Sequence, residues 1–250
     1  MSGPRPDPAA LYPEVAAHGS LAAALRAVAA GGLDAVPLRS PEDEPLFDAS
    51  AATTLPHREP LRISAWRFER RWNIRGEDPF QSLALLHGET DDLAQVARAV
   101  RAWHDGESLE DIHRVAPFAR PTGRFEVPDL RPGRLVESEW QGMLREAAEL
   151  EYPWAPAYRS LIETAYAEPA LRALYPFTSH WALRFSTTTR PWLTVVGPCL
   201  DASGEGDFGV GRGFIGRDLG EFATAREAVA AALIHLPAGL GEVALGTEPQ

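Results

Sequence analysis

The chain has 250 residues, of which 45% are hydrophobic, and its formal net charge is -11 at pH 7. This length and apolar content allow a sizeable buried core and argue against a disordered chain. The negative charge repels phosphates at long range, so we expect no binding to nucleic acid and none to a membrane surface.

Cofactor and metal motifs are missing from the sequence. Cys199 is the only cysteine, which excludes an internal disulfide and a cysteine-based zinc site. The histidines show no HExxH or other compact ligand spacing, and no P-loop or dinucleotide motif occurs. We therefore expect no metal and no cofactor. The first residues lack the signal-peptide pattern and no apolar run is long enough for a membrane span, which predicts a cytoplasmic protein.

Residues 1–60 are predicted to form an N-terminal helix followed by a connector. Ser20 is a suitable N-cap for an alanine-rich helix, and Gly31-Gly32 would end it. The segment from Leu33 to Pro60 is rich in Pro, Asp and Glu, which is typical of a connector with one edge strand at most.

Residues 61–135 are predicted to form a first α+β segment. The run LRISAWRFERRWNIRG, which begins at Leu61, alternates apolar and polar residues. This pattern predicts one long amphipathic strand, or a hairpin pinched near Arg70. Arg70 falls on the apolar side of the pattern. A bulge or snorkelling would bring it to the surface, whereas burial would require a carboxylate partner.

The first segment continues with a short strand at Ser82–Leu86 and an amphipathic helix. Leu93, Val96, Val100 and Trp103 recur at helical spacing. We expect Thr90 to cap this helix, since threonine is a favoured N-cap residue.

Residues 136–250 are predicted to form a helical linker and a second α+β segment. Three helices come first, then three strands joined by tight connections, and a last helix capped by Thr224 and Glu227. The expected helices are Ser138–Leu150, Ala157–Tyr166 and Pro169–Leu174, and the expected strands are His180–Ser186, Leu193–Leu200 and Phe208–Ile215.

The predicted fold class is α+β, with largely antiparallel sheet and packed helices. Two segments, about 61–103 and 180–236, share an order of antiparallel strands followed by an amphipathic helix. They would form either two β-β-α subdomains or one compact domain.

The stretch from Leu174 to Trp192 is the predicted functional region. Its apolar residues alternate with polar ones, which predicts a strand with one buried face. The residues expected in the core are Trp181, Leu183 and Phe185, and those on the opposite face are His180, Ala182, Arg184 and Ser186. This register is one residue from reversal, because a shift by one exchanges the two faces.

The opposite face supplies the candidate site. We expect His180 to act as a catalytic acid or base, because its imidazole exchanges a proton near neutral pH. The expected ligand-binding residues are Arg184, Ser186, Thr188, Arg190 and Trp192. Two plainer interpretations stay open: the face is merely solvated, and the threonines simply favour strand. Cys199 could pair with His180 as a nucleophile, although a lone cysteine in an apolar run is usually a buried small side chain.

Several motifs together resemble a family from actinobacteria whose members are described as natural-product biosynthesis proteins of unknown function. The motifs are GETDDLAQVARAVRAWHDGESLEDI (Gly88–Ile112), VESEW (Val136–Trp140), LRALYPFTSHWALRFSTTTRPW (Leu171–Trp192) and TAREAVAAALIHLP (Thr224–Pro237). The resemblance covers most of the chain from about Leu11. It implies a place in biosynthetic gene clusters, including those that make modified peptides, and supplies no catalytic residues.

Two functions follow as expectations, and the sequence leaves open whether the protein is an enzyme. The first is an accessory or tailoring protein of natural-product biosynthesis that binds a peptide or small intermediate at the His180 face. The second is a non-catalytic protein-binding module, such as an immunity or chaperone-like partner, whose acidic surface and exposed tryptophans would meet a basic partner. A plain structural subunit of a homo-oligomer also stays open. A deep pocket containing His180 would favour the first. A flat aromatic patch around Trp154, Tyr158 and Trp192 would favour the second.

Overall fold

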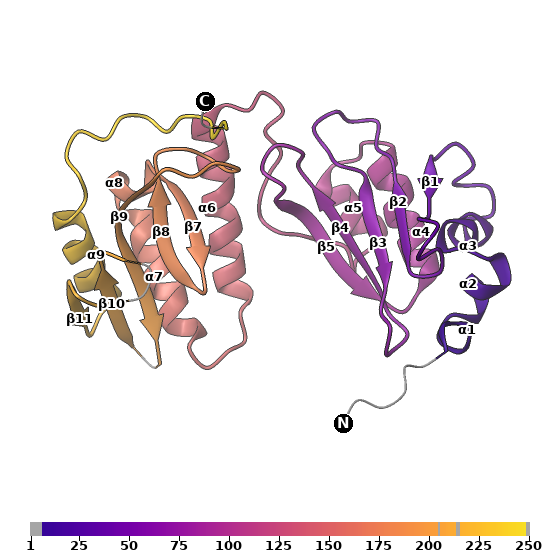
Figure 1. The fold of residues 1–250 in the computed structure, drawn as a ribbon, viewed down its shortest axis with the longest axis horizontal. Helices are drawn as coiled ribbons and strands as arrows, with labels where there is room; N and C mark the ends of the chain where they lie inside the picture. Colours follow the sequence, from indigo (N-terminus) through magenta and orange to yellow (C-terminus); the bar gives the residue numbers. More distant parts are fainter. Residues whose placement is uncertain (1–6, 205, 214–215, 249–250) are drawn as a thin grey trace. The chain divides into compact units, whose positions relative to one another are not determined.

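The computed structural model describes residues 7–204, 206–213 and 216–248. The chain divides into two compact units, Met1–Thr122 and Gly123–Gln250, each with a hydrophobic core of its own. Each unit consists of one antiparallel sheet with helices packed against it (Figure 1). The predicted α+β class with largely antiparallel sheet is therefore confirmed.

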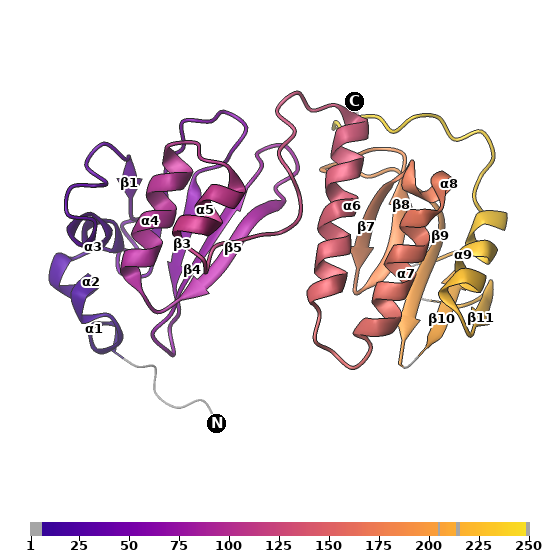
Figure 2. The same cartoon turned by 180° about the vertical axis from the view of Figure 1, so that it is seen from behind.

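The first unit is built on a six-stranded sheet whose strands follow one another in chain order. Its strands are β1 (Leu38–Arg39), β2 (Asp48–Ala51), β3 (Leu61–Ala65), β4 (Trp72–Glu77), β5 (Ala84–Thr90) and β6 (Arg120–Pro121). Its helices are α1 (Pro8–Leu11), α2 (Pro13–His18), α3 (Leu21–Val28), α4 (Leu93–His104) and α5 (Leu109–Val115). Figure 2 shows α4 and α5 against one face of this sheet.

The segment from 33 to 60 contributes more to the sheet than the sequence predicted. Instead of a connector with at most one strand, it supplies both β1 and β2, which pair with each other and with β3. Leu38, Ala49 and Ala51 are buried in the core of the first unit. Strands of two and four residues are too short to give a clear alternation, so their pairing depends on the neighbouring strand.

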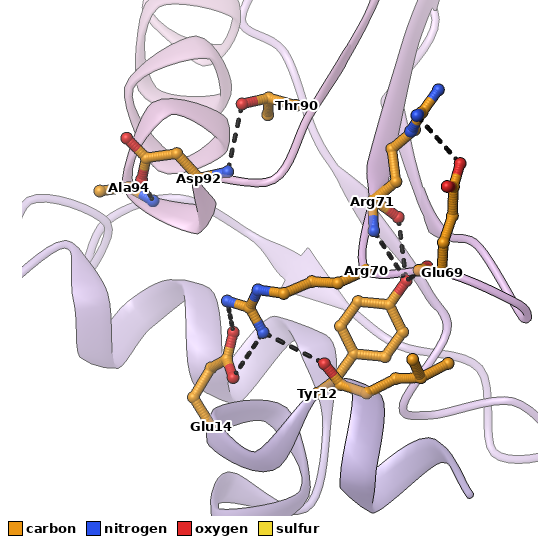
Figure 3. Close-up of polar contacts among 9 residues, drawn as sticks. Tyr12, Glu14, Glu69, Arg70, Arg71, Thr90, Asp92 and Ala94 are labelled. Carbon is orange, nitrogen blue, oxygen red and sulfur yellow. Dashed lines mark hydrogen bonds and ion pairs between the residues drawn. The ribbon is translucent and has the colours of Figure 1, made fainter. Parts of the chain in front are cut away.

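Residues 61–77 form a hairpin, which was one of the two predicted alternatives. Arg70 lies in the connection between β3 and β4, where it is ion-paired with Glu14. The hydroxyl of Tyr12 lies 2.7 Å from the carbonyl oxygen of Trp66. It also accepts a hydrogen bond from the backbone N–H of Arg71 at 3.1 Å (Figure 3). The start of α2 therefore fixes the β3–β4 connection, and Arg70 has the carboxylate partner at the surface rather than in the core.

Helix α4 is capped by Asp92 and not by Thr90. The Asp92 carboxylate accepts a hydrogen bond from the backbone N–H of Ala94 at 2.8 Å (Figure 3). Strand β5 extends through Thr90, whose hydroxyl accepts a hydrogen bond from the backbone N–H of Asp92 at 3.2 Å. The prediction placed the cap two residues too early because threonine and aspartate are both favoured at this position.

The second unit has a five-stranded sheet in the order β11-β10-β9-β8-β7. Its strands are β7 (Tyr175–Ser179), β8 (Ala182–Ser186), β9 (Val195–Ser203), β10 (Asp207–Gly211) and β11 (Gly220–Phe222). Its helices are α6 (Pro132–Glu149), α7 (Ala155–Ala167), α8 (Pro169–Arg172) and α9 (Ala225–Ile234). The predicted capping box of Thr224 and Glu227 is present. The strand expected to reach Ile215 ends at Gly211, and Phe214 and Ile215 lie outside the described residues.

We expect Phe185→Ala to lower the free energy of unfolding by about 3–5 kcal/mol, as buried aromatic truncations do. The ring is fully buried and lies 6.3 Å from that of Trp140. Arg184→Ala should cost about 1 kcal/mol, because the cation–π contact of Arg184 with Phe177 is partly exposed. Chemical denaturation of both variants measures this, and a larger loss for Arg184→Ala would mean that the faces of β8 are reversed.

Candidate functional site

Strands β7 and β8 are joined by a two-residue turn made of His180 and Trp181, between the paired residues Ser179 and Ala182. The φ angles of His180 and Trp181 are 50° and 66°. Positive φ at both central positions is the conformation of a type I′ turn, which matches the right-handed twist of the flanking strands. Left-handed backbone is unfavourable for residues other than glycine, so this turn requires compensating contacts.

The turn corrects part of the predicted register. Leu183 and Phe185 are buried, as the alternation predicted. Trp181, however, is 38% exposed and does not enter the core. The strand was predicted to start at His180, but the turn takes two residues out of the alternation and the strand begins at Ala182.

Four aromatic side chains meet at this turn, and we call them the aromatic surface. They are Tyr152 and Trp154, which precede α7, Tyr158 in the first turns of α7, and Trp181. The rings of Tyr152 and Trp154 are stacked with centroids 5.3 Å apart. The Trp181 ring lies 5.0 Å from that of Trp154 and 5.6 Å from that of Tyr158. Tyr152 is 56% exposed, whereas Tyr158 is fully buried beneath the others.

A patch of Trp154, Tyr158 and Trp192 would have favoured a protein-binding module. Trp154 and Tyr158 do lie together, but their further ring contact is with Trp181. Among the described residues, Trp192 makes no ring contact with the aromatic surface.

The buried phenol of Tyr158 is unusual chemically. Its hydroxyl has no hydrogen-bond partner among the described residues. Burial raises the pKa of Tyr158 far above its ordinary value, and the nearby carboxylates of Glu146 and Glu139 raise it further. This phenol stays protonated at neutral pH and serves as an apolar support for the ring of Trp181.

His180 and Arg184 do not share a strand face. His180 is exposed in the turn, where its Nδ1 lies 3.3 Å from the Ser179 hydroxyl. Arg184 lies in the middle of β8, with its guanidinium 5.4 Å from the centroid of the Phe177 ring. The two residues are four positions apart, which corresponds to about 13 Å along a strand. This arrangement therefore does not support the binding of one small anion by His180 and Arg184 together.

Cys199 lies on β9 opposite the middle of β8, as the pairing of Leu183 with Leu200 shows. It is buried, and burial raises the pKa of its thiol while the charge of Arg184 lowers it in part. His180 lies at the turn end of the hairpin, about 13 Å along the strand from Arg184. The structure does not bring the two together as a nucleophile and base.

The hydroxyls of Ser186, at the end of β8, and Thr188, just after it, form hydrogen bonds within the connection from β8 to β9. Ser186 is buried and donates to the carbonyl oxygen of Thr188 at 2.7 Å. The Thr188 hydroxyl donates to the carbonyl oxygen of Trp192 at 2.7 Å and accepts from the backbone N–H of Thr194 at 2.7 Å. These bonds support the structural interpretation of the threonine-rich stretch.

Arg190 and Trp192 complete the set of predicted ligand-binding residues. The Nε atom of Arg190 is buried with no hydrogen-bond partner among the described residues, and the Trp192 ring is partly exposed. Both follow the end of β8, roughly 20 Å along the strand from His180. The structure thus separates the predicted site. His180 is at the turn, Arg184 is in the middle of β8, Ser186 is at the other end of the strand, and Thr188, Arg190 and Trp192 follow it.

A metal site requires several ligand side chains close together. Among the described residues, no group of three or more His, Cys, Asp or Glu side chains is placed to hold a metal ion. None of the helices in those ranges is both long enough and apolar enough to cross a membrane.

We expect Tyr158→Phe to leave stability at neutral pH unchanged or to raise it by about 1 kcal/mol, since it removes an unsatisfied buried hydroxyl. The pKa of Tyr158 is higher in the folded protein than in the unfolded chain, so the folded state holds the phenolic proton more tightly. The wild type therefore keeps its stability below about pH 10 and loses it as the pH rises further. The variant should therefore lose less stability above about pH 10. Denaturant titrations of both proteins at neutral pH and above about pH 10 measure this difference in the free energy of unfolding. A strongly destabilised variant would show that the hydroxyl has a bonding role.

Comparison with known proteins is informative only for the second unit. A model of a family of unknown function, DUF6193, matches residues 134–247. The match begins within α6 and ends in the segment after α9, so it covers the aromatic surface but less than half of the chain. No curated protein and no solved structure matches. The second unit is similar to this family, whose function is unknown.

Proposed function

We propose that this protein is a non-catalytic accessory protein of natural-product biosynthesis that binds a basic peptide at the aromatic surface. The observation that carries the proposal is the arrangement of Tyr152, Trp154 and Trp181, whose rings pack on one another and remain partly open to solvent.

The packing of the rings favours binding. Tryptophan and tyrosine dominate the energetics of protein interfaces, because they offer a large contact area with few rotatable bonds. Trp181 is held on two sides by Trp154 and Tyr158, so its ring is already ordered before a partner arrives. Little side-chain entropy remains to be lost on binding, which is the benefit of preorganisation.

The charge of the chain favours a basic partner. The net charge of -11 attracts cationic peptides at long range. At short range, a lysine or arginine placed over an aromatic ring gains a cation–π interaction, which is strongest with tryptophan. Glu151, an exposed carboxylate next to Tyr152, adds a local negative charge. These features together favour a peptide that carries Lys or Arg.

The biosynthetic role depends on the resemblance in the motifs quoted above, and a modified peptide would be a suitable partner in that setting. A tailoring enzyme that uses His180 has less support. The imidazole is on an exposed turn, whereas catalytic groups usually lie in concave sites.

We expect selection from a library of displayed short random peptides to enrich sequences that contain Lys or Arg. The affinity of an enriched peptide, measured by fluorescence anisotropy, should fall by about tenfold or more in Trp181→Ala, the loss typical of an interface hot spot. The matched control is Phe68→Ala, which removes a 67% exposed aromatic ring from the first unit. This control should bind as the wild type does.

A second variant separates binding from folding. The double change His180→Asn and Trp181→Gly inserts residues that favour a type I′ turn, so the hairpin should stay intact without the ring. Peptide binding should be lost in this variant while its melting temperature stays close to the wild-type value. No enrichment, or equal affinity of the wild type and Trp181→Ala, would contradict the proposed function.

A further inference from the structure

A row of basic side chains crosses the first sheet from edge to edge. The strand register places six residues opposite one another in succession: Arg39, Ser50, Arg62, Arg75, His87 and Arg120. We call these six residues the basic row. All but Ser50 are exposed, and the residues that alternate with them along the strands are mostly buried. The row therefore lies on the face away from α4 and α5, which is the face toward the viewer in Figure 1.

The charges of this row are poorly balanced within the chain. Elsewhere in the first unit most exposed arginines have a carboxylate partner. Arg70 has Glu14 (Figure 3), and Arg71 has Glu89. In contrast, no ion pair between described residues involves Arg39 or Arg120.

Arg62 and Arg75 have to share one carboxylate, that of Glu77. Glu77 is buried and ion-paired with Arg75, and its other oxygen lies 3.7 Å from Nη2 of Arg62. Arg62 and Arg75 are directly opposite on adjacent antiparallel strands. Like charges in that position destabilise a sheet. An external anion between the two guanidinium groups would remove this repulsion.

The surface is hollowed beside the row. A concavity of about 640 Å³ is lined by Arg39, Arg62 and Arg75 on one side. Asp48, Ser64 and Asn73 line the other side and form the neighbouring row of paired residues on the same face. This volume is within the range of small-molecule sites. The concavity therefore offers cations at one end and hydrogen-bonding groups, including one carboxylate, at the other.

We propose that the basic row is a binding site for a small molecule that carries a diphosphate group. Arg62 and Arg75 are on adjacent strands, about 5 Å apart, and their guanidinium groups can each bind two oxygens of a phosphoryl group. Arg39, two strands from Arg62, would hold the outer oxygens. Asp48, Ser64 and Asn73 would bind hydroxyl or amino groups at the other end of the ligand. The site is separate from the aromatic surface and does not depend on the proposed function.

A nucleic acid is a poorer fit to the same cations. Proteins that bind single strands on a sheet use exposed aromatic side chains on which bases stack. No member of the basic row is an aromatic residue of the Phe, Tyr or Trp type, and the net charge of -11 opposes a long polyanion. A compact anion makes full use of three arginines without extending over the acidic remainder of the surface.

The test is isothermal titration calorimetry of the full chain with inorganic pyrophosphate, using sulfate at equal ionic strength for comparison. We expect pyrophosphate to bind and sulfate to bind far more weakly. Arg62→Gln and Arg39→Gln should each weaken pyrophosphate binding by roughly tenfold, the loss expected for one charge-assisted hydrogen bond. Arg114→Gln is the matched control, because its side chain is 72% exposed, close to the 70% of Arg62, but lies on α5 at the other face.

Circular dichroism should show that Arg62→Gln melts no lower than the wild type, since the substitution removes a repulsive pair. Failure of the wild type to bind pyrophosphate would overturn the proposal. An equal loss of pyrophosphate affinity in Arg114→Gln would also overturn it, as would sulfate binding as tight as that of pyrophosphate. Single-stranded RNA that binds more tightly than pyrophosphate and is released by the same substitutions would assign the row to nucleic acid instead.

Discussion

The aromatic surface of the second unit depends on one strained turn. His180 and Trp181 both adopt left-handed backbone without being glycine, at a cost of about 1–2 kcal/mol per residue. The packing of the Trp181 ring on Trp154 and Tyr158 offsets much of this cost, because each aromatic pair contributes about 0.5–1.5 kcal/mol beyond its buried area. The turn and the rings thus stabilise each other. A glycine turn would be easier to form, but it would have no side chain to complete the aromatic surface.

The two units use a similar plan and expose different chemistry. In both, an antiparallel sheet buries one face against helices. The first unit leaves the opposite face of its sheet lined with cations, and Glu77 is the buried carboxylate that allows Arg62 and Arg75 to stand opposite each other. The second unit instead exposes aromatic rings at the end of a hairpin. The facing arginines of the first unit and the left-handed turn of the second unit each lower the stability of the fold. Such local costs in stability are expected at surfaces that serve binding.

The sequence predicted those features that depend on local periodicity. Alternation placed Leu183 and Phe185 in the core, and helical spacing located α4. The turn was missed because His-Trp carries none of the Asn or Gly signals of a type I′ turn. The basic row was missed for another reason. It depends on the register of six strands, which is set by long-range pairing and cannot be read from any one strand. Strands as short as β1 and β6 show no periodicity at all.

The most direct test of the account follows the tryptophan side chains during peptide binding. The seven indole N–H signals can be assigned in an NMR spectrum by single substitutions and followed as a selected basic peptide is added. We expect the signals of Trp154 and Trp181 to shift, and those of the buried Trp72, Trp103 and Trp140 to stay in place. Shifts confined to Trp66 or Trp192, or no shifts at saturation, would contradict the assignment of binding to the aromatic surface.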